Sequence, residues 1–443
     1  MNATPPTPDL PSNEPAQAGW RRAWQQLREP ASWRMAVLGF AAGLPLLLVL
    51  GTLSFRLREA GINRSTIGFL SWVGLAYGFK WAWSPLVDRL ALPGLTRRLG
   101  RRRAWLLLSQ ALLLLGLVGM AWFDPREALM PLVLCAVLVA FASATQDIAL
   151  DAWRIESAPV EAQATLAAMY QGGYRLAMIW AGAGVLWIAA AVQGDAQGGY
   201  SHAAWQAAYA VMALSLLPGV LTVLRSSEPA PQPLPPARNL AAWLREAVLA
   251  PLLDFWRRYR WHAVRFLALV AVYRISDVVM GIMANPFYVD MGFTKDEVAT
   301  VSKLYGVLMT LVGAFVGAML SARFGVMRVL MLGALLSALT NLLFAWLAGV
   351  GHSMTALIWV VSADNLASGI ASAAFIAYLS SLTNVQYSAT QYALLSSLML
   401  LLPKFLAGFS GVAVNAWGYE WFFVGTALLG LPVLLLVALA SRR

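Results

Sequence analysis

The chain has 443 residues, of which 60% are hydrophobic and only 12% are charged. A soluble domain carries about a quarter charged residues, so this composition excludes an ordinary soluble enzyme and requires much of the surface to face lipid. The formal net charge of +11 does not indicate a nucleic-acid-binding protein. The basic residues gather in a few short segments beside apolar runs, as residues that set membrane topology do.

The N-terminal segment, residues 1–33, is polar and Pro-rich, and it lacks the short apolar core of a cleavable signal peptide. Beyond it, apolar runs of about twenty residues recur, and this is the length that a helix needs to cross a bilayer. The runs cover residues 34–56, 65–90, 103–123, 129–155, 160–192, 204–225, 259–289, 296–321, 327–349, 354–383, 387–416 and 419–440. The sequence therefore predicts an all-α membrane protein with twelve transmembrane helices.

The longest interruption lies between the sixth and seventh runs and covers residues 226–258. It opens with a Pro-rich stretch. From residue 239 onward, apolar residues recur at helical spacing, namely Trp243, Leu244, Ala247, Val248, Leu252 and Phe255. We expect an amphipathic helix lying on the membrane surface here. This linker would separate a six-helix bundle at residues 34–225 from a second one at residues 259–443.

Lysine and arginine residues crowd at one set of helix ends and are scarce at the other. The crowded ends hold Arg21, Arg22, Arg28, Arg97, Arg98, Arg101, Arg102, Arg103, Arg238, Arg245, Arg257, Arg258, Arg260, Arg442 and Arg443. The opposite ends hold little beyond Arg56, Arg58, Arg64, Arg126 and Lys295. Because positive residues are kept in the cytoplasm, we expect both termini and the central linker to be cytoplasmic.

Six helices, a basic cytoplasmic linker and six more helices resemble the plan of the major facilitator superfamily, with its two six-helix bundles. Asp88-Arg89 at the end of the second predicted helix and Gly100-Arg101-Arg102-Arg103 before the third resemble the loop signature of that superfamily. A carboxylate at such a helix end can pair with arginines and hold the cytoplasmic side shut. We therefore assign Asp88 and Arg89 to a gate.

The fourth predicted helix carries Asp147, Asp151 and Arg154 toward its cytoplasmic end. An unpaired charge inside a bilayer costs roughly 3 kcal/mol or more, so such residues mark solute pathways or proton relays. Asp147 and Asp151 are four residues apart and share one helical face, and Arg154 stays on that side. Asp151 and Arg154 fall near the level of Asp88, so we favour a gate role for them over a binding role.

Five stretches, spread over both halves, carry a resemblance to one family. They are Ala144-Thr-Gln-Asp-Ile-Ala-Leu-Asp-Ala-Trp153, with Gly39–Pro45, Phe79–Pro85, Gly173–Met178 and Ser388–Ser396 in support. Together they resemble the AmpG-type muropeptide permeases. The chain departs from some members of that family in showing no helices beyond the twelve.

The resemblance implies proton-driven import of N-acetylglucosamine–anhydro-N-acetylmuramic acid peptides across the bacterial inner membrane for peptidoglycan recycling. In some bacteria this import feeds β-lactamase induction, and so antibiotic resistance. A nearby family that moves acetyl-CoA has a related charged fourth helix, so an acetyl-CoA or other organic-anion facilitator stays open as the alternative.

Cations near the bilayer midplane are the first candidates for substrate binding, because the implied substrate carries several carboxylates. At 1.5 Å of rise per residue, Lys80 and Arg175 both fall near the midplane. The alternative is that each neutralises a neighbouring aspartate and only holds helices together. The full set of substrate-binding candidates is Lys80, Gln146, Tyr174, Arg175 and Lys404. Lys303 lies nearer the outer end, where its side chain can reach the membrane surface.

Proton coupling needs a carboxyl group that gains and loses a proton as its exposure alternates. Asp147 fits this role, and Asp364 in the tenth predicted helix is its counterpart in the second half. Asp277 is a further candidate. Since Arg274 lies three residues before Asp277, we favour a structural ion pair between these two.

Signatures of other protein classes are missing from the sequence. There is no Walker loop, and the three histidines are scattered without metal-ligand spacing. An intramembrane hydrolase using Asp147 and Asp151 as an acid pair fits the twelve-helix plan poorly. We therefore expect no enzyme activity, catalytic residue, metal or cofactor. The expected partners are the muropeptide, protons and membrane lipid, with no nucleic acid, and we expect a monomer.

Overall fold

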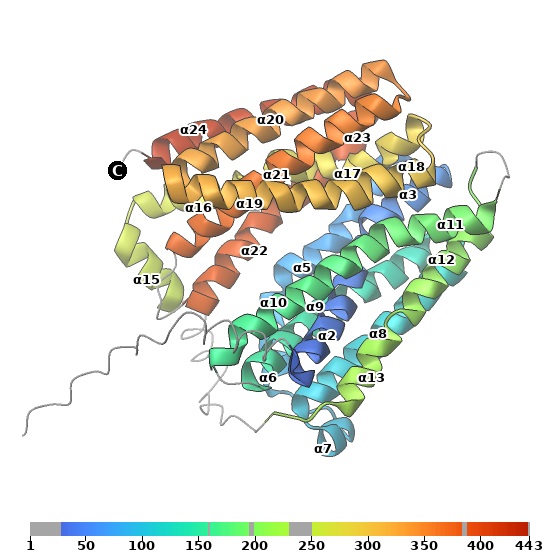
Figure 1. The fold of residues 1–443 in the computed structure, drawn as a ribbon, viewed down its shortest axis with the longest axis vertical. Coiled ribbons are helices and arrows are strands. Elements are labelled where there is room, and N and C mark those ends of the chain that lie inside the picture. The colour runs from blue at the N-terminus through green and yellow to red at the C-terminus, as the bar shows by residue number, and fades with distance from the viewer. Residues whose placement is uncertain (1–27, 158–159, 195–198, 230–249, 383–387, 442–443) are drawn as a thin grey trace, which may run out of the picture.

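The computed structural model describes residues 28–157, 160–194, 199–229, 250–382 and 388–441. Within these ranges the chain is almost entirely helical and contains no strand. The helices form two halves that lie side by side, coloured blue to green and yellow to red in Figure 1. The predicted surface helix at residues 239–258 lies mostly outside the described residues, and only its end is seen, in α15 (Ala250–Tyr259).

The first half contains the six helices that the hydropathy pattern predicts, several of them divided into shorter pieces. In chain order the elements are α2 (Pro30–Val49), α3 (Gly51–Glu59), α4 (Arg64–Leu70), η1 (Ser71–Gly74), α5 (Leu75–Phe79), η2 (Lys80–Ala82), α6 (Ser84–Arg89), α7 (Leu95–Leu99), α8 (Arg101–Trp122), α9 (Leu129–Ser157), α10 (Val160–Ile179), η3 (Trp180–Gly184), α11 (Val185–Gln193), α12 (His202–Leu214) and α13 (Leu217–Arg225).

The second half repeats this plan after α15. Its elements are α16 (His262–Val272), α17 (Ile275–Asp290), α18 (Lys295–Glu297), η5 (Val298–Tyr305), α19 (Gly306–Phe324), α20 (Val326–Val350), α21 (Met354–Leu382), α22 (Ser388–Ala407), α23 (Ser410–Leu428) and α24 (Gly430–Ser441). The seventh helix begins at His262 and not at residue 259 as the sequence suggested, because Arg260 adopts a positive φ of 46° that separates it from α15.

Ten helical stretches of the described residues are long and apolar enough to cross a membrane. The second predicted helix is missing from these ten because 3₁₀ segments at Ser71–Gly74 and Lys80–Ala82 divide it into short pieces. The eleventh begins in α22 and continues to Gly418, whose φ of 77° breaks α23. Since glycine adopts positive φ without strain, the chain can turn there into the twelfth helix.

Close helix packing within each half depends on glycines. A Cβ at Gly39 of α2 would collide with the Tyr170 carbonyl of α10, and one at Gly173 of α10 would collide with the Ala36 carbonyl. In the second half, Gly369 of α21 meets the Thr310 carbonyl of α19 in the same way. Small residues let transmembrane helices approach closely enough to pack by dispersion forces, which replace the hydrophobic effect inside lipid.

The two halves meet at one end of the molecule and diverge at the other (Figure 1). At the closed end, α3 packs on α17, α11 packs on α18, and the π-helical segments η3 and η5 pack on each other. We call the opposite end the open end. It carries α6 and α7 of the first half, and α15 and the start of α22 of the second half.

Candidate functional site

A lysine and an aspartate face each other inside the first half. Lys80 begins the 3₁₀ segment η2, and its Nζ lies 3.9 Å from Oδ2 of Asp147 in α9. This distance allows attraction but no direct hydrogen bond. Oδ1 of Asp147 is buried and has no hydrogen-bond partner in the described part of the chain. A buried carboxylate oxygen without a partner is costly, so this site favours the arrival of a proton, a water molecule or a ligand.

Gln146, the neighbour of Asp147, is completely buried. Neither of its side-chain polar atoms has a partner among the described residues. The side chain is therefore not exposed to a cleft in this conformation, and a substrate could reach it only after a rearrangement. Its role as a substrate contact stays a prediction.

Helix α10 brings two tyrosines and an arginine to the same region. The rings of Tyr170 and Tyr174 lie 6.0 Å apart, and both hydroxyls are within electrostatic range of Asp147. Arg175 is exposed, and its Nη1 lies 3.5 Å from Sδ of Met178. No carboxylate of the described residues lies within ion-pair distance of Arg175, so in this conformation it is not the structural partner of an aspartate.

The open end carries two local ion pairs, and one of them joins two of the gate candidates. Arg154 lies 3.4 Å from Asp151, of which 51% is exposed, and Arg102 of α8 lies 2.6 Å from Glu156 of α9. The sequence did not predict Glu156. The side chains of Asp88 and Arg89 lie outside the described part of the chain, so their role in a gate stays a prediction.

A glutamate of the linker also holds this region together. Glu228 accepts hydrogen bonds from the backbone N–H groups of Arg102 and Arg103, at 2.7 and 3.0 Å, at the start of α8. A carboxylate at a helix N-terminus satisfies free N–H groups and complements the helix dipole. This contact ties the start of the linker to the first half.

The second half contains a polar cluster of different character. Arg274 and Asp277 form the expected ion pair at 3.4 Å, and Nη1 of Arg274 donates to Oγ of Ser372 at 2.5 Å. Asp364 accepts a hydrogen bond from Thr340 at 3.2 Å and lies within electrostatic range of the pair. Arg274, Asp277 and Asp364 therefore lie together, and each has a partner.

Lys404 and Lys303 lie where the second half packs on the first. Lys404 of α22 donates to the Gly74 carbonyl of the first half at 2.7 Å, and its Nζ lies 5.4 Å from the centre of the Tyr77 ring. The expectation that Lys303 reaches the membrane surface is wrong. Its Nζ donates to Asn285 of α17 at 2.6 Å, and it belongs to η5, which packs on η3 of the first half. The sequence alone could not identify these partners, because they come from other helices.

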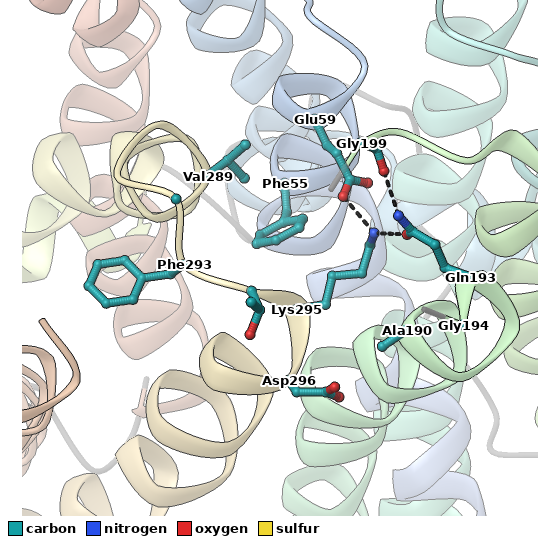
Figure 2. A pocket seen from close by; sticks show the side chains of 12 residues that line it. Phe55, Glu59, Ala190, Gln193, Gly194, Gly199, Val289, Phe293, Lys295 and Asp296 are labelled. Atoms are coloured by element: carbon teal, nitrogen blue, oxygen red, sulfur yellow. Dashed lines mark hydrogen bonds and ion pairs between the residues drawn. The ribbon is translucent and has the colours of Figure 1, made fainter. Parts of the chain in front are cut away.

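The closed end carries ion pairs that the sequence did not predict. Lys295, only 7% exposed, lies 2.5 Å from Glu59 and donates to the amide oxygen of Gln193 (Figure 2). Asp290 of α17 lies 2.5 Å from Arg58 and 2.7 Å from Arg64. Each contact joins the first half to the second. One feature of the sequence could have indicated these ion pairs. Arg58 and Arg64 flank a single loop on the side of the membrane where positive residues are scarce.

A pocket of about 470 Å³ lies over the Glu59–Lys295 pair. Its walls come from both halves, with Phe55 and Ala190 on one side and Val289 and Phe293 on the other (Figure 2). Trp205 donates to Glu59 at 2.6 Å. The pair therefore forms the floor of a vestibule at the closed end.

Two curated relatives decide the family. A protein named putative transporter AmpG 4 from Rickettsia conorii is 34% identical over 411 residues, which cover 92% of this chain and 95% of the relative. The anhydromuropeptide permease of Escherichia coli K12 is 36% identical over 421 residues, which cover 94% of this chain and 80% of that protein. The chain belongs to the AmpG family of permeases. It is a multi-pass membrane transporter, and permeases of this family are not enzymes.

A family model described as acetyl-coenzyme A transporter 1 matches residues 33–171. Among solved structures, the nucleoside transporter NupG superposes with a TM-score of 0.69 at 12% identity, covering 93% of this chain and 100% of that one. A bacterial homologue of the lysosomal transporter Spinster, in an inward-facing and unoccupied conformation, gives a TM-score of 0.67 at 15% identity, covering 95% and 97%. These likenesses confirm the major facilitator fold.

Proposed function

We propose that this AmpG-family permease imports cell-wall-derived anhydro-muropeptides across the bacterial inner membrane by proton symport, in peptidoglycan recycling. The observation that carries the proposal is the 36% identity, over 94% of the chain, to a relative named anhydromuropeptide permease. The Lys80–Asp147 site supports it, because a carboxylate-bearing substrate and a proton are the two species that such a pair can exchange.

The orientation of the chain follows from its charge distribution. The arginine-rich ends of the helices coincide with the open end, so we propose that the open end and both termini face the cytoplasm. On this assignment the structure is inward-facing, and the vestibule over Glu59 and Lys295 faces outward. Opening to the outside requires the ion pairs of the closed end to separate.

The site in the first half would couple proton uptake to substrate binding because the Asp147 carboxylate and a substrate carboxylate compete for the Lys80 ammonium. When Asp147 takes up a proton from the outside, its attraction to Lys80 falls, and the Lys80 ammonium becomes available to a substrate carboxylate. Arg175 would hold a second carboxylate, and Tyr174 would stack on a sugar ring. After the halves rock, substrate leaves to the cytoplasm, Asp147 releases its proton there, and Lys80 pairs with the carboxylate again.

The remaining candidates have subordinate roles in this proposal. Lys404 would act through its bond to helix two, holding the halves together until substrate arrives. Asp364 and Asp277 would be secondary proton sites. Asp88, Arg89, Asp151 and Arg154 would form the cytoplasmic gate, and the functional unit would be a monomer.

An organic-anion carrier is the second candidate function, favoured by the match of residues 33–171 to an acetyl-coenzyme A transporter model. Coenzyme A and muropeptides are both anionic, so the cations alone do not separate them. The family relationship over nearly the whole chain favours the muropeptide.

Uptake of radiolabelled anhydro-muropeptide into proteoliposomes tests the proposal. We expect accumulation when the inside is more alkaline than the outside, loss of accumulation when the gradient is collapsed, and no competition by excess acetyl-CoA. Accumulation that does not depend on the pH gradient would show that transport is not coupled to protons. Uptake of radiolabelled acetyl-CoA in the same assay, without any muropeptide transport, would establish the second candidate.

A further inference from the structure

The transport proposal does not use the corner between α15 and α16 (Figure 1). This corner carries two exposed tryptophans, Trp256 and Trp261, and four exposed arginines, Arg257, Arg258, Arg260 and Arg265. Arg260 forms the corner with a φ of 46°, a conformation that costs a non-glycine residue free energy. Backbone hydrogen bonds hold it there, from Arg260 N–H to the Trp256 carbonyl at 2.7 Å and from Ala263 N–H to the Arg260 carbonyl at 3.0 Å. The direction of α15 is thereby fixed relative to the spanning helix.

The inner side of the corner is firmly packed. Phe255 is buried, and the ring of Tyr259 lies 4.8 Å from it and 5.1 Å from Phe266 of α16. Nη2 of Arg258 donates to the Leu382 carbonyl at the end of α21 at 3.3 Å. These contacts make α15 a rigid platform and not a loosely attached tail.

The outer side of the corner is apolar, and no part of the chain that the structure describes covers it. Trp256 is 44% exposed and Trp261 is 78% exposed, and their rings meet edge to face at 5.9 Å. Leu253 and Val264 are also exposed on either side of them. Val264 belongs to the spanning helix α16, so this apolar stripe continues into the surface that faces lipid. Tryptophan in such a place is typical of the membrane–water interface.

Three exposed arginines lie on the same corner as the apolar stripe. Arg257, Arg260 and Arg265 are exposed, and no carboxylate of the described residues lies within ion-pair distance of any of them. The nearby carboxylate of Asp254 is taken by Arg258 at 3.0 Å. The corner therefore combines three guanidinium groups that have no ion-pair partner among the described residues with an apolar surface that continues into the bilayer.

We propose that this corner binds the headgroup of an anionic phospholipid, with Arg257, Arg260 and Arg265 on the phosphate and glycerol side and Trp256 and Trp261 along the chains. A guanidinium group can bind two oxygens of one phosphate at once, through two parallel N–H···O hydrogen bonds. A soluble anion would gain nothing from the apolar stripe, and an acidic protein segment would not need its continuity with α16. The inference holds whatever solute the protein carries.

Native mass spectrometry of the full-length protein in detergent tests the site, by titration with phosphatidylglycerol, phosphatidylcholine or glycerol 3-phosphate. We expect phosphatidylglycerol to bind at least tenfold more tightly than phosphatidylcholine. The variant Arg257→Gln/Arg260→Gln/Arg265→Gln should bind phosphatidylglycerol roughly 100-fold more weakly, because each arginine beside an anionic lipid contributes about a fivefold factor. Lysine at the three positions keeps the charge and loses the bidentate contacts, so its binding should fall between that of the original protein and that of the glutamine variant.

A matched control removes three exposed arginines from the same end of the first half, Arg97→Gln/Arg98→Gln/Arg225→Gln, and should change binding by less than about threefold. An equal loss in this control would overturn the site, because general charge would then explain the binding. Glycerol 3-phosphate competing as well as the lipid would do the same. Trp256→Ala/Trp261→Ala, which keeps the charges, should weaken phosphatidylglycerol binding about tenfold, and unchanged binding would contradict a lipid ligand.

Discussion

The two halves contain one buried aspartate cluster each, and the clusters differ in how well their polar atoms are satisfied. In the first half, Asp147 has an oxygen without a partner among the described residues, and Nζ of Lys80 lies 3.9 Å from its other oxygen. In the second half, Asp364, Asp277 and Arg274 each have a partner at 3.4 Å or less. An incomplete site can accept a proton or a ligand without first breaking a bond, whereas a complete one mainly holds helices together. The comparison assigns exchange to the first half and support to the second.

Replacing Asp147 with Asn is the most direct test of this difference between the halves. We expect proton-driven uptake to fall at least 100-fold while the protein keeps its folded state, because the charge removed had no close partner to lose. Uptake into proteoliposomes with an imposed pH gradient, together with size-exclusion chromatography, measures both effects. Asp364→Asn is the matched control, with an expected loss of no more than about fivefold. Equal losses in the two variants would end the distinction between the halves.

The opposite result is expected for Arg274→Gln. This change leaves Asp277 and Asp364 together without their cation, and breaking a partly buried ion pair in this way costs about 2 kcal/mol of folding stability. The midpoint of thermal unfolding in detergent should fall by several degrees, and Asp277→Asn added to it should recover part of the loss. An unchanged midpoint of thermal unfolding would show that the Arg274–Asp277–Asp364 cluster does not stabilise the fold.

The closed end allows a charge-exchange experiment. Glu59→Lys or Lys295→Glu alone places like charges together, so each should favour separation of the halves and slow uptake about tenfold. The double variant restores the attraction, although a lysine at position 59 cannot accept the hydrogen bond from Trp205. We expect it to recover to within about threefold of the original rate. Lack of any recovery would show that the ion pair does not join the halves during transport.

The smallest effect is expected at Lys404. Lys404→Met keeps the length of the side chain and loses the bond to the Gly74 carbonyl. If Lys404 only links the halves, the maximal uptake rate should change by up to about fivefold while the substrate concentration for half-maximal uptake stays constant. A large rise in that concentration would return Lys404 to the substrate-binding residues.

The sequence predicted the twelve helices because the mean hydropathy of a spanning helix depends only on about twenty consecutive residues. It also predicted the Arg274–Asp277 ion pair, which the structure contains, because two charged residues at helical spacing are visible locally. Asp147 stands out in the sequence as an ionisable residue in an apolar run, and its role in transport stays a prediction. The partners of Lys404, Lys303 and Asp290 could not be predicted, since they come from the other half or another helix. The complete burial of Gln146 depends on neighbouring helices in the same way. Gly74, Gly78 and Pro85 were local signs that helix two is divided.

The facing segments η3 and η5 have a consequence for how the halves can move. A π-helical turn holds one residue more than an α-helical turn, and the surplus residue can be passed along a helix without unfolding it. Such a shift rotates the stretch between the old and new positions of the surplus residue by about 100°. Helices five and eight could therefore act as a pair of swivels, which re-aim the side chains of that stretch while the glycine-packed ends stay in place.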